Sequence, residues 1–378
     1  MEKKPLRPVW AEINLDNYRH NIKVIKKRYP DTKVMAVVKA DGYGHGAVQV
    51  AEAALRGGAE RLAIAIVDEG IELRQAGFEV PIQILGGTGE EQLEQVVDYD
   101  LIQTVFELEI VKKLSKIAGQ KDKKVKVHLK VDTGMGRVGV RPEEAAEMAE
   151  AILKIPNIEL EGLMTHFATA DEEDKSYTMQ QAQGYRLALK EIEEKGIDIP
   201  VKHVANSATL IDLPDLKYDM IRPGIISYGL WPSDQVSHQI DVKPVMEWKA
   251  EVIYVKEVPA GTGISYGKTY VTEEKTKVAT LPLGYADGYS RHLSNKGQVL
   301  IKGQRADVIG RVCMDQFMVD VSHIDDINVG DEVVLLGKQG DDFISAEEMA
   351  EWIGTINYEV VCDVSKRVPR YYLKNREK

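Results

Sequence analysis

The stretch Lys33-Val-Met-Ala-Val-Val-Lys-Ala-Asp-Gly-Tyr-Gly-His-Gly46 joins a short β-branched run to a glycine-rich turn, and similar runs recur down to residue 221. The runs are Lys33–Val38, Leu62–Ile66, Ile82–Leu85, Leu101–Thr104, Val125–Leu129, Ile158–Leu163, Val201–Val204 and Tyr218–Ile221. Segments with helical spacing separate them, for example Ala145, Met148, Ala149, Ile152 and Leu153. Strands that alternate with helices need crossover connections and therefore form a parallel sheet. Eight such units are the number that closes a (β/α)₈ barrel, and an open doubly wound sheet is the alternative.

The pattern changes after about residue 240, where strand-like runs follow one another with turns between them. These runs are Glu251–Val255, Val278–Leu281, Val299–Ile301, Asp307–Gly310, Phe317–Val321 and Glu332–Leu336. One helix is expected after Ser345, where Glu348 completes a capping box.

The fold class is therefore α/β, with an N-terminal (β/α)₈ barrel and a C-terminal mainly-β domain. We place the barrel at residues 12–235 and the β domain at residues 236–378, with the linker at Trp231–Asp234. A first strand over Val9–Leu15 precedes a helix that Asp16 caps. Whether residues 1–11 join the β domain stays open.

Composition and charge argue against several classes of protein. The chain has 378 residues, and 49 Lys and Arg against 60 Asp and Glu give a formal charge of −11. Nucleic-acid binders normally carry a basic surplus, so no nucleic-acid partner is expected. No apolar run approaches the ~20 residues that span a bilayer, and the first residues lack an export signal, so no membrane partner is expected either. Cys313 and Cys362 are then expected to be reduced thiols in the cytoplasm.

Reactive residues of a (β/α)₈ barrel lie at the C-terminal ends of the strands and in the loops that follow. Candidates stand after five of the expected strands: Lys39, then Lys130 with Arg137, His166, Asn206 with Ser207, and Arg222 with Gly224 and Ile225. Lys39 is the sharpest, because a lysine in an apolar pocket has a lowered pKa and offers the free amine that attacks carbonyl groups. The alternative is an ordinary exposed lysine at the end of a strand.

The other candidates also have plain structural explanations. Ser207, Gly224 and Ile225 stand where barrels often bind phosphate, although Asn206 and Ser207 equally fit a helix cap. Arg222 fits a surface ion pair, and His166 fits a hydrogen-bonded core histidine. The eight histidines are scattered without ligand spacing, so no metal site is predicted.

Taken together, the ordered motifs resemble those of the bacterial alanine racemase family, whose members use pyridoxal 5′-phosphate. The resemblance covers nearly the whole chain. It rests on Ala36-Val-Val-Lys-Ala-Asp-Gly-Tyr-Gly-His-Gly46, Asp132-Thr-Gly-Met-Gly-Arg137, Thr165-His-Phe-Ala-Thr169, Asn206-Ser207, Arg222-Pro-Gly-Ile225, Ser265-Tyr-Gly267, Gly284-Tyr-Ala-Asp-Gly288, Cys313-Met-Asp315 and Ile356-Asn-Tyr358. One departure is Asp41-Gly42, where many members carry other small or polar residues.

The resemblance implies the interconversion of L- and D-alanine, which supplies D-alanine for the cell wall, by a homodimer with shared active sites. Lys39 would bind the cofactor covalently and act as one base, and Tyr266 from the partner subunit would be the second base. A phenol is a poor base at neutral pH, so Tyr266 would be tuned through His166, which is linked to Arg222 at the pyridine nitrogen.

The remaining roles come from the same resemblance. Tyr43, Asn206, Ser207, Gly224, Ile225 and Tyr358 would hold the cofactor, mostly through its phosphate. Arg137 would contact the cofactor and the substrate carboxylate, with Met314 also near that carboxylate. The amine of Lys130 would be carbamylated and position Arg137, and Tyr285 and Tyr358 would form a narrow gate that favours alanine by size.

Two other functions are alternatives to the racemisation of alanine. A related barrel decarboxylase of basic amino acids would place a carboxylate at the pyridine nitrogen, so Arg222 argues against it. A non-catalytic cofactor carrier would consist of the barrel alone, so the β domain and Tyr266 argue against that.

Overall fold

The structure is a computed structural model that describes residues 7–373. Within this range the chain divides into two compact units. The barrel unit comprises residues 17–42 and 47–243, and the β unit comprises residues 7–16, 43–46 and 244–373. Each unit is described by itself.

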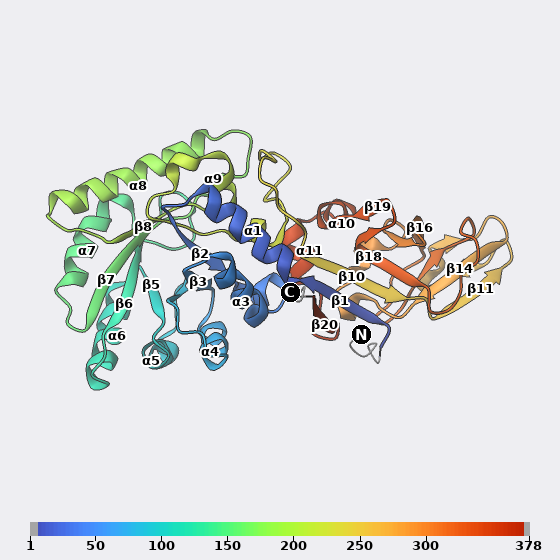
Figure 1. Ribbon diagram of the computed structural model, residues 1–378, viewed down its shortest axis with the longest axis horizontal. Helices are drawn as coiled ribbons and strands as arrows, with labels where there is room; N and C mark the ends of the chain where they lie inside the picture. The colour runs from blue at the N-terminus through green and yellow to red at the C-terminus, as the bar shows by residue number, and fades with distance from the viewer. Residues whose placement is uncertain (1–6, 374–378) are drawn as a thin grey trace, which may run out of the picture. The chain divides into compact units, whose positions relative to one another are not determined.

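The barrel unit contains eight parallel strands, and helices cover their outer side (Figure 1). The strands are β2 Lys33–Val37, β3 Arg61–Ile64, β4 Ile82–Ile84, β5 Ile102–Val105, β6 Val125–Lys130, β7 Ile158–Met164, β8 Val201–His203 and β9 Met220–Ile221. The helices are α1 Leu15–Arg28, α3 Ala47–Gly57, α4 Val67–Gln75, α5 Leu93–Asp98, α6 Leu108–Gln120, α7 Ala145–Leu153, α8 Ser176–Glu194 and α9 Ser207–Asp212. A further segment, α2 Lys39–Tyr43, is not right-handed and is described with the site.

The sheet closes on itself, which excludes the open doubly wound alternative. Its strands run in the order β8-β7-β6-β5-β4-β3-β2-β9, so β2 pairs with the last strand, with Lys33 opposite Met220. The two ends of this path, β8 and β9, are joined by backbone hydrogen bonds from Asp219 N to Lys202 O at 3.0 Å and from Arg222 N to Ala205 O at 2.9 Å. The predicted (β/α)₈ barrel is therefore confirmed.

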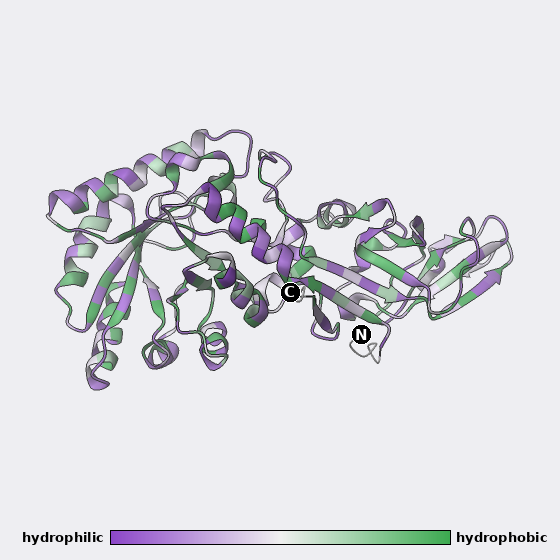
Figure 2. Cartoon of the chain, viewed as in Figure 1, coloured by the Kyte–Doolittle hydropathy of each residue, from purple (hydrophilic) through white to green (hydrophobic). Residues whose placement is uncertain are grey.

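The barrel strands are apolar because both of their faces are buried. All four residues of β3 and of β5 are buried, as expected for parallel strands between an interior and a layer of helices. Figure 2 shows the contrast, with hydrophobic residues along these strands and mixed residues along the helices. The short aliphatic runs that result are what made the eight strands visible in the sequence.

The β unit is built on a ten-stranded sheet with a small two-stranded hairpin beside it. Its strands are β1 Val9–Asn14, β10 Met246–Glu251, β11 Tyr254–Val258, β12 Gly263–Ile264, β13 Tyr270–Val271, β14 Thr276–Leu281, β15 Gln298–Ile301, β16 Gln304–Ile309, β17 Phe317–Asp320, β18 Glu332–Gln339, β19 Asp342–Ile344 and β20 Arg370–Leu373. Its helices are α10 Ala346–Ile353 and α11 Asn357–Cys362. The main path runs β11-β14-β17-β16-β15-β18-β10-β1-β20, with β19 paired to β18.

Strand β1 belongs to the β unit, a point that the sequence left open. It pairs antiparallel with β10, with Val9 opposite Ala250, and parallel with β20, with Ala11 opposite Arg370. The barrel unit continues to Lys243 rather than ending at residue 235. The reason is Asn21 of α1, whose side-chain amide exchanges two hydrogen bonds with the backbone of Lys243, at 2.8 and 2.9 Å.

Three local predictions were wrong in detail. The expected strand Glu251–Val255 straddles the junction of β10 and β11, because β10 pairs with β18 whereas β11 pairs with β14. Asp16 lies in the first turn of α1 instead of capping it, since the helix begins at Leu15. Ser345 does cap α10, with its Oγ 3.0 Å from Glu348 N, but the Glu348 carboxylate binds Arg305 instead of completing the capping box.

Candidate active site

Lys39 follows β2 at the C-terminal end of the barrel and opens a left-handed turn. Ala40, Asp41 and Gly42 have φ of 52°, 52° and 59° with ψ near 50°, and Tyr43 has φ of 51°. The turn is closed by a hydrogen bond from Gly42 N to Val38 O at 2.9 Å. A left-handed conformation costs roughly 1–2 kcal/mol for each residue other than glycine. Something else must therefore hold the backbone after Lys39.

The carboxylate of Glu69, in α4, is the main clamp on this turn. It accepts hydrogen bonds from Ala40 N at 2.5 Å, from Ala65 N at 2.7 Å and from Ile66 N at 3.3 Å. The ends of β2 and β3 are thus tied to one side chain. Glu69 is a residue that sequence reasoning missed, because a glutamate in the first turn of a helix usually serves that helix alone.

Arg222 lies at the end of β9 and is buried, with 3% of its surface exposed. Its guanidinium donates to His203 Nδ1 at 2.9 Å, to the carbonyl oxygens of Thr165 and Val204 at 2.9 and 3.0 Å, and more weakly to His166 Nδ1 at 3.4 Å. Burial lowers the pKa of Arg222 to about 10, so it still carries its charge at neutral pH. The surface ion pair that we considered for Arg222 is thereby excluded.

A chain of buried polar side chains continues from Arg222 through the barrel. His203 Nε2 lies 2.7 Å from His128 Nδ1, and His128 Nε2 lies 2.9 Å from the Glu161 carboxylate. Because Arg222 can only donate, His203 Nδ1 must accept, so His203 donates to His128 and His128 donates to Glu161. Burial, together with nearby Arg222 and Arg61, lowers the pKa of both histidines, which keeps them neutral. Arg61 balances the carboxylate through two hydrogen bonds, at 2.6 and 3.1 Å.

The predicted residues at the barrel mouth interact electrostatically. Burial and the charges of Arg222, Arg137, Lys130 and Lys39 hold the pKa of His166 well below its usual value. Burial and the charges of Arg137 and Arg222 lower the pKa of Lys130 to about 8. Lys130 is 2% exposed, whereas Arg137 lies on an exposed part of the loop after β6. The mouth therefore gathers positive charge that an anion would relieve.

The loops after β8 and β9 meet at Ser207. Its hydroxyl oxygen accepts hydrogen bonds from Gly224 N at 2.9 Å and Ile226 N at 3.5 Å. Within residues 7–373, no acceptor takes the hydroxyl proton of Ser207, which is 5% exposed. Asn206 does act as a helix cap, since its side-chain oxygen accepts from Thr209 N at 3.0 Å.

The β unit carries the remaining predicted site residues in two groups. In the first, Tyr266 is 72% exposed, Met314 is 52% exposed and Tyr285 is 42% exposed. Backbone hydrogen bonds join the loops of Tyr285 and Met314, from Tyr285 N to Cys313 O and from Ala286 N to Met314 O, both at 3.1 Å. The second group pairs Tyr43 with Tyr358, whose ring centres are 6.2 Å apart.

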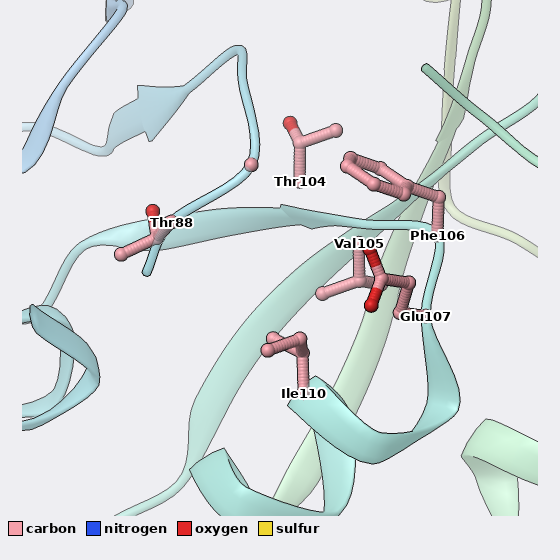
Figure 3. A pocket seen from close by; sticks show the side chains of 7 residues that line it. Thr88, Thr104, Val105, Phe106, Glu107 and Ile110 are labelled. Atoms are coloured by element: carbon pink, nitrogen blue, oxygen red, sulfur yellow. The ribbon is translucent and has the colours of Figure 1, made fainter. Parts of the chain in front are cut away.

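A small cavity at the ends of β4 and β5 takes no part in this set of residues. It has a volume of about 60 Å³ and is lined by Gly87, Thr88, Thr104, Val105, Phe106, Glu107 and Ile110. Figure 3 shows Phe106, Thr104 and Thr88 around it. None of the predicted site residues lines it, and it holds only a few atoms.

Residues 7–373 contain no group of three or more His, Cys, Asp or Glu side chains placed to hold a metal ion. In the same range, none of the helices combines the length and the hydrophobicity that crossing a membrane requires.

The buried chain beyond Arg222 was also missed by sequence reasoning. His128 lies within β6 and His203 ends β8, and both side chains are buried. A histidine among aliphatic strand residues is the one feature of the sequence that could have indicated a polar group inside the barrel. Their partner Glu161 lies on a third strand, β7. These three strands are neighbours in the sheet, and closure of the barrel beside β8 adds Arg222 of β9 to the chain.

The fold and the site define a barrel enzyme with a C-terminal β domain and a cationic mouth. Family models agree: the alanine racemase N-terminal domain matches residues 13–232, and the alanine racemase C-terminal domain matches residues 245–372. The chain belongs to the alanine racemase family, and it is an isomerase that interconverts L-alanine and D-alanine.

Relatives and solved structures match over the full length. Alanine racemase of Halothermothrix orenii is 53% identical over 377 residues, which are 100% of this chain and 99% of that protein. Alanine racemase of Methanococcus maripaludis is 50% identical, over 97% of this chain and 99% of that protein. Among structures, alanine racemase of Clostridium difficile 630 has a TM-score of 0.95 at 46% identity, covering 99% of this chain and 98% of that chain.

We predict that Glu69→Ala lowers the racemisation rate by about tenfold or more, because it releases the strained turn that directs Lys39. Glu72→Ala is the matched control, since Glu72 lies on the exposed face of the same helix. Steady-state kinetics with L-alanine measure the effect, and circular dichroism confirms that both variants are folded. Equal rates for the two variants would show that Glu69 serves only to cap α4.

Proposed function

We propose that the barrel mouth binds pyridoxal 5′-phosphate through Lys39 and that the active enzyme is a homodimer with shared sites. The donor set fits this cofactor. The buried Ser207 hydroxyl has a proton to give, and Ser207, Gly224 and Ile225 lie together where (β/α)₈ barrels bind phosphate groups. Asn206 would keep the loop in place as a helix cap, and Tyr43 and Tyr358 would complete the phosphate site.

When bound, the cofactor would supply an electron-accepting ring that makes the α-proton of alanine acidic. Arg222 would face the ring nitrogen. Because the buried Arg222 guanidinium keeps its charge at neutral pH and can only donate hydrogen bonds, the ring nitrogen would accept from it and stay unprotonated. The buried, charged guanidinium of Arg222 at the end of β9 is the single observation that carries the proposed reaction. It favours racemisation over the decarboxylase alternative, in which a carboxylate would occupy the place of Arg222.

Two bases would then act on opposite faces of the substrate. Lys39 would take or return the α-proton on one face, and Tyr266 of the partner subunit would do so on the other. The exposure of Tyr266 in the single chain supports a role toward a second chain. His166 accepts from Arg222 through Nδ1, so its Nε2–H remains available to donate to the phenolic oxygen of Tyr266.

Substrate selection would rest on charge and size. Arg137 would bind the carboxylate of alanine, with Met314 of the partner subunit beside it. Tyr285 and Tyr358 would narrow the access route, so that larger amino acids are excluded. The D-alanine formed would serve cell-wall synthesis in the cytoplasm.

Lys130 would carry a carbamate that fixes Arg137. Its amine adds CO₂ to form the carbamate and releases one proton, a reaction that needs the neutral amine. The lowered pKa of Lys130, about 8, makes that form available near neutral pH. A negative carbamate between Arg137 and Arg222 would also relieve the positive charge of the mouth.

The proposed covalent attachment is tested by reducing the holoenzyme with borohydride and mapping the labelled peptide. We expect a single label on Lys39. The Lys39→Ala protein should lack the visible absorbance of the bound cofactor, whereas Lys33→Ala, at the exposed start of the same strand, should keep it. A label on another lysine would refute the assignment.

We predict that Tyr266→Phe lowers racemisation strongly and equally from both enantiomers, because the equilibrium constant between enantiomers is one. Exchange of the α-proton with solvent without inversion should survive for the one enantiomer whose proton faces Lys39. Proton NMR in D₂O, started separately from L- and D-alanine, measures both rates. Normal racemisation by Tyr266→Phe would remove Tyr266 as the second base.

We predict that the carbamate on Lys130 forms increasingly as the pH rises through about 8, because the folded-state pKa lies there and only the neutral amine reacts. Carbon-13 NMR with labelled bicarbonate should show one protein-bound carbamate signal. Lys130→Ala should lose the signal, and Lys124→Ala, an exposed lysine just before the same strand, should retain it. Absence of the signal at pH 9 together with full activity in CO₂-free buffer would contradict the proposal.

A further inference from the structure

Tyr266 lies at the tip of the β12–β13 hairpin, and the residue before it has an unusual backbone. The hairpin pairs Gly263 with Val271 and Ile264 with Tyr270, which leaves residues 265–269 as the connecting loop. Ser265 has φ of 62° and ψ of −173°. This region of backbone conformation is essentially restricted to glycine. A serine is therefore unexpected at this position.

The Ser265 side chain makes the hydrogen bonds that hold this conformation. Its Oγ donates to Arg311 O at 2.6 Å and lies 3.3 Å from Cys313 Sγ. The hydroxyl has one proton, which goes to Arg311 O, and the Cys313 thiol also lies 3.6 Å from that same carbonyl oxygen, so Ser265, Cys313 and Arg311 form one small cluster. Both bonds connect the hairpin tip to the segment that also carries Met314.

The close approach of the two segments depends on a glycine. A Cβ on Gly310 would lie 2.7 Å from Ile264 O and 2.9 Å from Ser265 Cβ. Below the tip, Ile264 is buried with Val258, Val278 and Ile309 in one apolar cluster. On the other side of Tyr266, Asn295 donates to Thr269 Oγ1 at 3.2 Å and accepts from Gly310 N at 2.6 Å. Tyr266 is thus the exposed part of a loop that is fixed on both sides.

A hairpin that only needed a tight turn would be satisfied by glycine at position 265. Glycine adopts this conformation without steric cost, but it offers no hydroxyl. Serine is strained in this conformation, but its hydroxyl contacts Arg311 O and Cys313 Sγ, and these contacts fix the backbone that leads to Tyr266. The strained backbone and the hydrogen bonds that hold it therefore belong to one residue, Ser265, which immediately precedes the proposed second base.

We propose that Ser265 is a positioning residue for Tyr266, acting through its hydroxyl bonds to Arg311 and Cys313. The inference rests on the proposed role of Tyr266 as the second base. Ser265 touches neither substrate nor cofactor in this proposal. It fixes the backbone from which the phenol projects, so that the phenolic oxygen meets only one face of the substrate.

The experiment compares Ser265→Ala and Ser265→Gly in the holoenzyme. Alanine removes the hydroxyl and keeps the strain, whereas glycine removes both, so Ser265→Gly should fold even if Ser265→Ala does not. We expect both variants to racemise alanine about tenfold to hundredfold more slowly. Exchange of the α-proton without inversion, on the face of Lys39, should keep its parental rate. Amide hydrogen exchange of residues 263–268 should become faster.

The matched control is Ser322→Ala in the same unit. The Ser322 hydroxyl likewise makes one hydrogen bond to backbone, accepting from Lys277 N at 2.9 Å, but it lies on a different loop. We expect Ser322→Ala to keep the parental racemisation rate and the parental hydrogen exchange of residues 263–268. Parental racemisation by Ser265→Gly, or equal losses on the two faces of the substrate, would overturn the proposal.

A double variant separates this proposal from the role of Tyr266 itself. If Ser265 acts through Tyr266, adding Ser265→Gly to Tyr266→Phe should cause no further loss. A further loss of tenfold in the double variant would place the effect elsewhere and refute the positioning role. A parental racemisation rate in the single variant Tyr266→Phe would instead refute the role of Tyr266 as the second base. This variant is therefore measured first, before the Ser265 variants.

Discussion

The buried guanidinium of Arg222 constrains the rest of the barrel site. Within residues 7–373 it hydrogen-bonds only neutral acceptors, namely two carbonyl oxygens and the ring nitrogens of His203 and His166. A buried cation without a carboxylate partner must be offset by well-made hydrogen bonds. It also acts on its surroundings, since its charge adds to the effect of burial in lowering the pKa of His166, His203 and Lys130. This charge, together with those of Arg137, Lys130 and Lys39, makes the mouth cationic.

Strained backbone accompanies both proposed bases, and each strained segment has its own clamp. The left-handed turn after Lys39 is held by Glu69 of α4, and the glycine-like conformation before Tyr266 is held by the hydroxyl of Ser265. Strain of this kind persists only where the surrounding structure over-determines it, and it is concentrated at functional sites. The two clamps lie in different units of the chain, so each base is oriented by local contacts of its own.

The electrostatic arrangement also bears on the competing functions. A decarboxylase benefits from a protonated ring nitrogen, for which a carboxylate is the natural partner. Here the carboxylate of Glu161 is two histidines away from Arg222 and is paired with Arg61 and Lys126. A non-catalytic carrier would need only the barrel, whereas in this chain the β unit carries Tyr266 on a hairpin that is fixed on both sides. These observations agree with membership of the alanine racemase family.

The sequence by itself determined the eight barrel strands, because most residues on both faces are buried and each strand carries a short aliphatic run. It also determined the candidates Lys39, Lys130, His166 and Arg222, because a residue at the end of a strand is recognisable from the strand alone. Closure of the barrel, the join of β1 to the β unit and the break between β10 and β11 were decided by the tertiary structure. The same holds for the Glu161–His128–His203–Arg222 chain and the clamp by Glu69, since their members meet only after strands distant in sequence pair. The conformation of Ser265 was also hidden, because backbone strain depends on contacts with a segment some 46 residues away and leaves no mark in local composition.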